Sequence, residues 1–256
     1  MNKLILGTDK TELLHDLPDK FLIIDDGKLI DALPTFPKTF RVTRLDLSTH
    51  SLNPLKDIDY RRARQFISVL DAVFPEGENT LTKKASNFVL LTALLSHPTR
   101  LDRLIPRPHK TDTGAQDAYQ KVQTLLLSPV LKRFLCHSTN FPLDGIILAR
   151  LNRAELTDFD CFVIGNLLIS TYQSPVVIPD FGFYACVFHT SLVRQNRLIA
   201  GINFLAEVPK LRNSLLTIPT KVGRHTTAED AETLASYAGL SPGTNAYTDF
   251  IAKCLE

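Results

Sequence analysis

A short apolar strand carries the residue best suited to phosphate chemistry in this sequence. The run Val176–Ile178 contains three β-branched residues, and Asp180 follows it after one proline. In nucleotide-hydrolysing α/β sheets, an acidic residue just beyond a buried strand meets Mg²⁺ and phosphates at the carboxyl edge of the sheet. Asp180 is therefore a candidate catalytic and magnesium-binding residue. An ordinary turn aspartate after a strand has the same local pattern.

A second group of candidates is basic and lies in the stretch His97–Gly114, where three prolines exclude a continuous helix and predict a long surface loop. Four cations in this loop could contact the phosphate backbone of a nucleic acid, namely Arg100, Arg103, Arg107 and Lys110. Asp102 dilutes their charge, and no aromatic residues alternate with them to stack on bases. A solvated charged face is the alternative interpretation.

The composition is that of a folded protein and excludes several classes. Hydrophobic residues make up 44% and charged residues 22% of 256, and no apolar run approaches the roughly 18 residues of a membrane span. A net charge of +2 is too balanced to indicate nucleic-acid binding by the whole surface. The N-terminus does not resemble a secretory signal, so a cytoplasmic location is expected. The four cysteines and seven histidines show no metal-ligand spacing.

Apolar runs alternate with helix-period segments along the chain, which is typical of a parallel sheet covered by helices. The sequence thus predicts an α/β fold with a mostly parallel central sheet and helices on both faces. We expect one domain over residues 1–256, with a mainly helical segment and the basic loop at about 57–140. The predicted strands are Lys3–Leu6, Phe21–Ile24, Phe40–Leu45, Gly145–Leu151, Val176–Ile178, Leu198–Phe204 and Thr217–Val222. The predicted helices are Asp59–Phe74, Lys83–Leu95, Ala115–Leu127, Ala154–Ser170, Phe188–Asn196 and Ala228–Ala238.

The last of these helices has the clearest predicted boundaries. Thr226 and Glu229 have the spacing of a capping box, and Gly239 stands where a left-handed residue would end the helix.

The order of segments after Asp180 carries a resemblance to a known family. A helix ends at Arg197, the apolar strand Leu198–Phe204 follows, and three further segments complete the order: Glu207–Arg212, Lys221–His225, and a helix opening Glu229-Asp230-Ala231. This order resembles the C-terminal half of the HerA, FtsK and type IV coupling-protein group of P-loop ATPases. Farther toward the N-terminus, Phe21–Gly27 looks like the second strand of the group with its acidic-glycine turn, and Asn53-Pro54-Leu55 looks like a recurrent segment.

The resemblance implies roles for individual residues and for the whole fold. It implies a P-loop NTPase core of the RecA-like type, with Asp180 at the Walker B position that binds magnesium. Arg194 or Arg197 would reach the nucleotide of a neighbouring subunit, although arginines at a helix end also complement the helix dipole without further function. Asn203 would be the sensor amide, although an asparagine at a strand end is also a common turn residue.

Two motifs of the group are altered in this sequence. A Walker A loop has the pattern Gly-x-x-x-x-Gly-Lys-[Ser/Thr], whose backbone amides surround phosphates. Here Gly7 comes three residues before Lys10 and Thr11, and Asp9 replaces the second glycine. At Walker B, Phe181 stands where a glutamate normally polarises the attacking water. Gly7, Lys10 and Thr11 are the candidate nucleotide-binding residues of this shortened loop.

Two functions from different classes follow from these observations. The first is a degenerate P-loop ATPase-like component of DNA translocation, conjugative transfer or genome packaging in a mobile element or virus, with ATP and Mg²⁺ as cofactors and DNA as a partner. The family works as ring hexamers, so the resemblance implies a homo-oligomer or a paralogous motor subunit. The second is a non-catalytic structural or adaptor subunit without a cofactor. The first function predicts that the strand before Gly7 lies beside the strand bearing Asp180, with the side chains of Lys10 and Asp180 converging.

Overall fold

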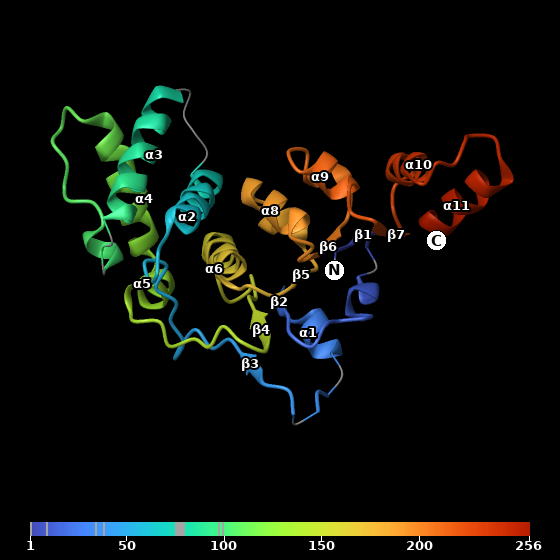
Figure 1. Cartoon of the computed structure of the whole chain (residues 1–256), viewed down its shortest axis with the longest axis horizontal. Helices are drawn as coiled ribbons and strands as arrows, with labels where there is room; N and C mark the ends of the chain where they lie inside the picture. The colour runs from blue at the N-terminus through green and yellow to red at the C-terminus, as the bar shows by residue number, and fades with distance from the viewer. Residues whose placement is uncertain are drawn as a thin grey trace. The chain divides into compact units, whose positions relative to one another are not determined.

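All seven strands among the described residues belong to one parallel sheet. The computed structural model describes residues 2–8, 10–33, 35–37, 39–74, 80–96, 98 and 100–256. The strands are β1 (Lys3–Gly7), β2 (Leu22–Asp25), β3 (Val42–Arg44), β4 (Ile146–Arg150), β5 (Val176–Ile178), β6 (Leu198–Ile202) and β7 (Thr220–Arg224). Their order is β3-β4-β2-β5-β6-β1-β7, which can be followed across the strand labels of Figure 1. Every predicted strand is present, so the predicted parallel α/β sheet is confirmed.

The central strands are apolar except for Lys3 in β1 and Asp25 in β2, because both faces of the sheet are covered. Every residue of β1, β2, β5 and β6 is buried. Buried strands of this kind appear in sequence as continuous apolar runs instead of alternating ones. On one face, Ile5, Ile23, Val177 and Ile199 from four strands form a cluster with Leu13 from the segment after β1. This cluster anchors the segment that carries Lys10.

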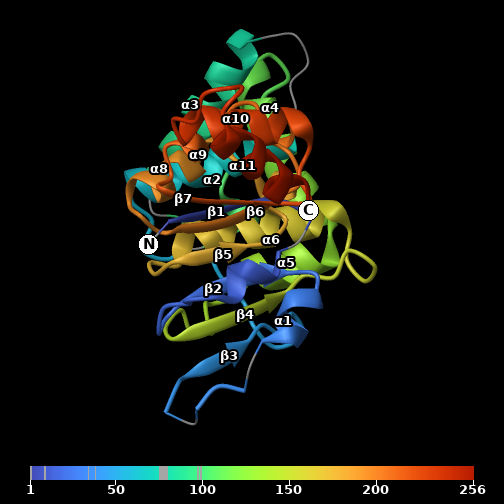
Figure 2. The same ribbon diagram turned by 90° about the vertical axis from the view of Figure 1, so that its right-hand side faces the viewer.

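The sheet forms one compact unit with the helices that precede β2, directly follow β2 and follow β5. This unit contains residues 1–44, 144–152 and 173–256. Figures 1 and 2 show α1 on one side of the sheet and α8, α9 and α10 on the other. The helices are η1 (Thr11–Leu14), α1 (Lys28–Ala32), α7 (Phe181–Tyr184), η3 (Val187–His189), α8 (Thr190–Arg194), η4 (Leu205–Glu207), α9 (Arg212–Leu216), α10 (Ala228–Tyr237) and α11 (Asn245–Leu255).

The remaining residues form a second, helical unit made of residues 45–143 and 153–172. Its helices are α2 (Tyr60–Val73), α3 (Thr80–Leu95), η2 (Leu101–Arg103), α4 (Thr113–Leu127), α5 (Pro129–Cys136) and α6 (Asp158–Thr171). Asp59 caps α2 by accepting a hydrogen bond from the N–H of Arg62, as its sequence position predicts. The helical segment at 57–140 is thus present, and the grouping of both units into a single domain stays a prediction.

The boundaries of α10 confirm one sequence prediction and correct another. Gly239 has φ +72° and the N–H of Leu240 donates to the carbonyl of Ala235, so the glycine ends the helix as predicted. The N-cap, however, is Thr227, whose hydroxyl accepts from the N–H of Asp230, and not Thr226. The predicted capping box was wrong by one residue because two adjacent threonines offer the same side chain.

No helix among the described residues is long and apolar enough to cross a membrane.

Candidate functional site

The candidate residues Lys10, Asp180 and Asn203 all lie at the carboxyl edge of the sheet. Lys10 follows β1, Asp180 follows β5 and Asn203 follows β6 directly. Because the strands are parallel, their carboxyl ends share one edge, which is the edge where α/β sheets bind ligands. All three side chains are half-buried.

The strand before Gly7 does not lie beside the strand bearing Asp180, so that detail of the sequence prediction was wrong. β6 lies between β1 and β5 and pairs with both. Two strand spacings amount to about 10 Å, which the long side chain of a lysine can span in part. Strand neighbours depend on pairing between distant segments, so the apolar runs alone do not specify them.

Gly201 of β6 leaves space for the side chain of Lys10. A methyl group at Gly201 would lie 2.8 Å from Cδ of Lys10 and 2.6 Å from the carbonyl oxygen of Pro179, the residue before Asp180. The methylene chain of Lys10 therefore lies over Gly201, a residue without a side chain. The charge of Asp180 acts on the pKa of Lys10, and the convergence of the two side chains stays a prediction.

Burial changes the acidity of Lys10. Desolvation lowers the pKa of its ammonium group from 10.5 to about 8, and the nearby carboxylates of Glu207 and Asp180 partly oppose this shift. The ammonium group donates a hydrogen bond to the carbonyl oxygen of Gly7 at 2.5 Å. Lys10 is thus turned toward its own loop in this structure.

The loop after β1 differs from a phosphate-binding loop in its length and in the helix at its end. A P-loop connects a strand to a helix whose first N–H groups face phosphate. Here the segment that begins at Thr11 is the four-residue 3₁₀ helix η1, and the side chain of Thr11 is exposed. Asp9 lies outside the described residues.

Gly7 is needed for a reason other than phosphate binding. Its φ is +117°, and a methyl group there would lie 1.6 Å from the carbonyl oxygen of Arg224. Arg224 is its partner in the pairing of β1 with β7. Gly7 therefore permits the close approach of two strand ends.

Glu207 is a site residue that the sequence reasoning missed. Its carboxylate accepts hydrogen bonds from the backbone N–H of Asn203 at 3.1 Å and from Nδ2 of Asn203 at 2.9 Å. Of the two carboxylates that act on the pKa of Lys10, Glu207 has the larger effect. Asn203 and Glu207 form no recognised sequence motif. The only signal in the sequence is their separation of four residues just after a strand.

The loop that carries Glu207 is held from α10. The buried carboxylate of Asp230 accepts a hydrogen bond from the N–H of Leu205, the first residue of η4, at 3.1 Å. Asp230 belongs to the Glu-Asp-Ala opening that contributed to the family resemblance, and in this structure it has a local structural role. It fixes the connection between β6 and Glu207.

Phe181 points away from these polar groups. Its side chain is fully buried, its ring centroid lies 5.2 Å from that of His189, and it lines a small space with Leu211 and Leu215. Burial keeps His189 neutral by lowering its pKa to about 3. Position 181 is therefore part of the core beneath the strand-end turn.

Arg194 and Arg197 lie at the opposite edge of the sheet. Both precede β6, and Arg197 donates to the carbonyl oxygen of Ser174 and to Oε1 of Gln195. Arg194 is exposed at the end of α8. Neither can join Lys10 and Asp180 within one copy of the chain, and a role toward a neighbouring subunit stays a prediction.

The basic loop is less open than the sequence predicts. Leu101, Leu104 and Ile105 are buried, and η2 forms within the predicted loop, so apolar anchors hold this segment to the helical unit. Arg100 makes a two-point ion pair with Asp102, at 2.9 and 2.6 Å. The side chains of Arg103, Arg107 and Lys110 are exposed, and His97 and Thr99 lie outside the described residues. Nucleic-acid binding by this loop stays a prediction.

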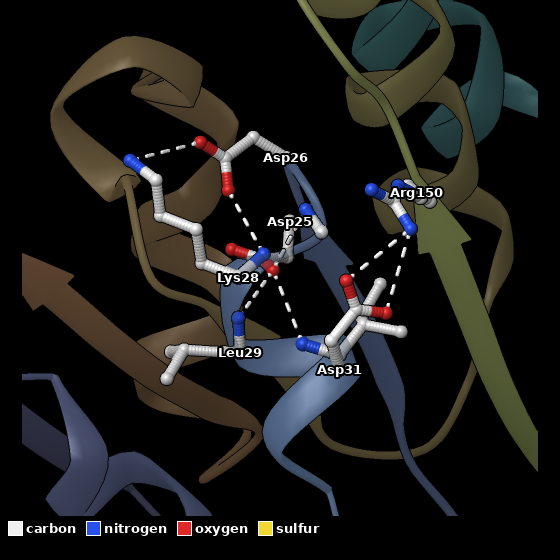
Figure 3. Close-up of polar contacts among 8 residues, drawn as sticks. Asp25, Asp26, Lys28, Leu29, Asp31 and Arg150 are labelled. Carbon is white, nitrogen blue, oxygen red and sulfur yellow. Dashed lines mark hydrogen bonds and ion pairs between the residues drawn. The ribbon is translucent and has the colours of Figure 1, made fainter.

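The acidic-glycine turn after β2 uses its carboxylates to hold itself together. The buried carboxylate of Asp25 accepts from the N–H groups of Gly27, Leu29 and Ile30, which stabilises the start of α1. Figure 3 shows this turn with Arg150, which pairs with Asp31 at 3.3 Å. Gly27 has φ +123°, and its missing side chain leaves room for the guanidinium group of Arg150. The acidic residues and the glycine of this turn are therefore explained by the stability of the turn itself.

The lowered pKa of Lys10 predicts unusual reactivity. At pH 8 about half of the Lys10 side chains are neutral and nucleophilic, compared with less than about 1% for an ordinary lysine. We expect acetylation of Lys10, followed by peptide mass spectrometry across a pH series, to show a midpoint of about 8. Glu207→Gln should lower that midpoint because the Glu207 carboxylate favours the charged amine. A midpoint near 10.5 in both proteins would contradict the burial of Lys10 beside Glu207.

Comparison with solved structures defines the class of the fold. No protein-family model matches the chain, and no curated protein matches it. VirB4 of Thermoanaerobacter pseudethanolicus has a TM-score of 0.58 at 11% identity, over 94% of this chain and 81% of that chain. The plasmid coupling protein TrwB, in complex with the non-hydrolysable GTP analogue GDPNP, has a TM-score of 0.58 at 12% identity, over 92% and 74%. TrwB with the ATP analogue ADPNP has a TM-score of 0.56.

The chain therefore has a P-loop ATPase-like fold, and its structural neighbours belong to the coupling and conjugation group of P-loop ATPases. This agrees with the resemblance inferred from the order of segments after Asp180.

Proposed function

We propose that this protein is a P-loop ATPase-like component of a conjugative DNA transfer apparatus or of a related DNA translocation or packaging machine. The observation that carries the proposal is the packing of Lys10 over Gly201 at the carboxyl edge of the sheet, where the charge of Asp180 acts on the pKa of Lys10. The fold shared with TrwB supports the proposal, since TrwB has been solved in complex with nucleotide analogues.

In this proposal the site binds ATP with Mg²⁺. Lys10 releases the carbonyl of Gly7 and binds phosphate, and Thr11 contributes its hydroxyl. Asp180 is the carboxylate that holds Mg²⁺. A magnesium ion often takes only one or two protein carboxylates and completes its shell with phosphate and water, so the half-buried Asp180 is a suitable ligand. The ion would offset the negative charge of the phosphates.

Nucleotide binding in this proposal is weak. Only two residues separate Gly7 from Lys10, so the loop offers few amides, and η1 is too short to supply a helix terminus. Lys10 also exchanges its contacts with Gly7 and its nearby carboxylates for those with phosphate. We therefore infer that the Walker A and Walker B motifs are degenerate.

DNA and a second subunit complete the proposal. Arg103, Arg107 and Lys110 are exposed and can contact a phosphate backbone. The exposed Arg194 at the other sheet edge can reach the nucleotide of a neighbouring copy or of a paralogous motor subunit, and Arg197 supports the same role less directly because its guanidinium group is already bonded.

The second candidate function is a non-catalytic adaptor that retains the fold without nucleotide chemistry. Two observations favour it: the contact of Lys10 with the Gly7 carbonyl and the burial of Phe181 at the position of the usual general base. An adaptor of this kind would keep its assembly surfaces and bind no nucleotide.

Titration calorimetry with ATP and Mg²⁺ separates the two functions. We expect the wild-type chain to bind, and Lys10→Ala and Asp180→Ala each to weaken binding at least about tenfold, because each removes a charge that contacts phosphate or its counter-ion. Lys132→Ala, which removes an exposed lysine in the helical unit, is the matched control and should leave nucleotide affinity unchanged. Absence of binding by the wild type would instead support the adaptor.

A further inference from the structure

We propose that Glu207 is the general base of the nucleotide site and accepts the proton of the attacking water. This inference rests on the proposed nucleotide function and identifies the residue that would replace the glutamate absent from position 181. It is supported by the place of the Glu207 carboxylate, by its orientation and by its electrostatic partner.

The carboxylate of Glu207 lies beside the turn that carries Asp180. A methyl group at Gly182 would be 2.6 Å from Oε2 of Glu207 and 3.1 Å from its Cδ. Gly182 comes two residues after Asp180, so its lack of a side chain leaves the space that the carboxylate occupies. A negative oxygen is thus present next to the Asp180 turn although the side chain at position 181 faces the core.

Asn203 orients this carboxylate without saturating it. The backbone N–H of Asn203 donates to Oε2, and Nδ2 of Asn203 donates to Oε1. Each carboxylate oxygen can accept two hydrogen bonds, so each keeps one further acceptor position in addition to these contacts. Asp230 restrains the same loop through the N–H of Leu205. The carboxylate is therefore held in one orientation, as a group that takes up a proton from a bound water should be.

Lys10 links Glu207 to the place where phosphate would bind. Glu207 is the largest electrostatic partner of the Lys10 ammonium group, ahead of Asp180. A phosphate bound by Lys10 would therefore lie near the Glu207 carboxylate, and the attacking water would stand between these two groups of like charge. The lysine attracts phosphate, and the carboxylate attracts the hydrogen atoms of the water.

The proposed step balances with water as the only co-reactant. The water oxygen forms a bond to the γ-phosphorus of ATP, and the bond from that phosphorus to the bridging oxygen breaks, with the electron pair leaving on ADP. One proton of the water passes to a carboxylate oxygen of Glu207 and is then released to solvent or to the phosphate product. Glu207 returns to its carboxylate form.

The test compares Glu207→Gln with the wild type in two measurements on the full chain. Glutamine keeps the shape of the side chain and removes the proton-accepting charge. We expect calorimetry to show ATP affinity within about threefold of the wild type, while phosphate release at saturating ATP and Mg²⁺ falls about 100-fold. Glu232→Gln, an exposed glutamate on α10, is the matched control and should change neither value. Thermal unfolding checks that both variants are folded.

The two measurements separate the inference from the function on which it rests. Phosphate release by Glu207→Gln at the wild-type rate overturns the assignment of Glu207. A wild type that binds ATP but releases no phosphate overturns it as well, and leaves the nucleotide site in place. A wild type that binds no ATP overturns the proposed function together with the inference.

Discussion

Replacing Gly7 by alanine is expected to lower the melting temperature of the protein by about 10 °C, which corresponds to about 3 kcal/mol for a chain of this size. The added methyl group would lie 1.6 Å from the carbonyl oxygen of Arg224. Because that oxygen belongs to the backbone of β7, no side-chain rotation relieves the contact, and the ends of β1 and β7 must separate. The φ of +117° at position 7 adds strain that only glycine avoids.

Gly239→Ala is the control that separates strain from collision. Gly239 also has a positive φ, +72°, but a methyl group there meets nothing within 4 Å. We expect this variant to cost only about 1 kcal/mol, as measured by thermal unfolding under the same conditions. Equal losses in the two variants would show that backbone conformation alone, and not the approach of β7, requires Gly7.

Restoring the usual glutamate after Asp180 is expected to damage the protein instead of activating it. Phe181→Glu places a carboxylate in the buried space formed with Val193, Leu211 and Leu215. The neighbouring His189 is neutral, with a pKa of about 3, and offers no positive charge in return. We expect a loss of about 4 kcal/mol in the free energy of unfolding, measured by urea denaturation, and no gain in ATP hydrolysis.

Phe181→Leu is the corresponding control, since it shortens the side chain without adding a charge, and we expect it to cost about 1.5 kcal/mol. A stable Phe181→Glu variant with raised phosphate release would mean that position 181 reaches the site, and Glu207 would then not be needed as the base.

The helices that were missed show what local patterns require. The helix α5 begins with Ser128 as N-cap and Pro129 at the first helical position, a recognisable start, but its eight residues are too few for a clear period. The helix α11 begins after the cap of Thr244 and buries only Cys254, so its apolar stripe is weak. The helices with a long apolar stripe, such as α2 and α4, were predicted almost to their ends.

The candidate site also contains residues that local patterns predict and residues that they do not. Asp180 could be found because a strand of three buried residues precedes it, and Asn203 because it ends another strand. Glu207 could not, because its importance comes from contacts with Asn203, with the backbone of Gly182 and with the charge of Lys10. The sequence did not indicate the role of Gly201 or Gly182 either, since each glycine leaves space for a side chain from another segment.

The sequence by itself determined the seven strands and the helices with a long apolar stripe, and that the strands form a buried parallel sheet. Burial and backbone conformation act on each segment locally, so continuous apolar runs, caps and glycines record them. Only the tertiary structure decided that β6 lies between β1 and β5, that the side chain of Lys10 lies over Gly201, and that Glu207 lies beside the Asp180 turn. Those relations come from packing between segments far apart in the chain, and spacing along the sequence carries no record of them.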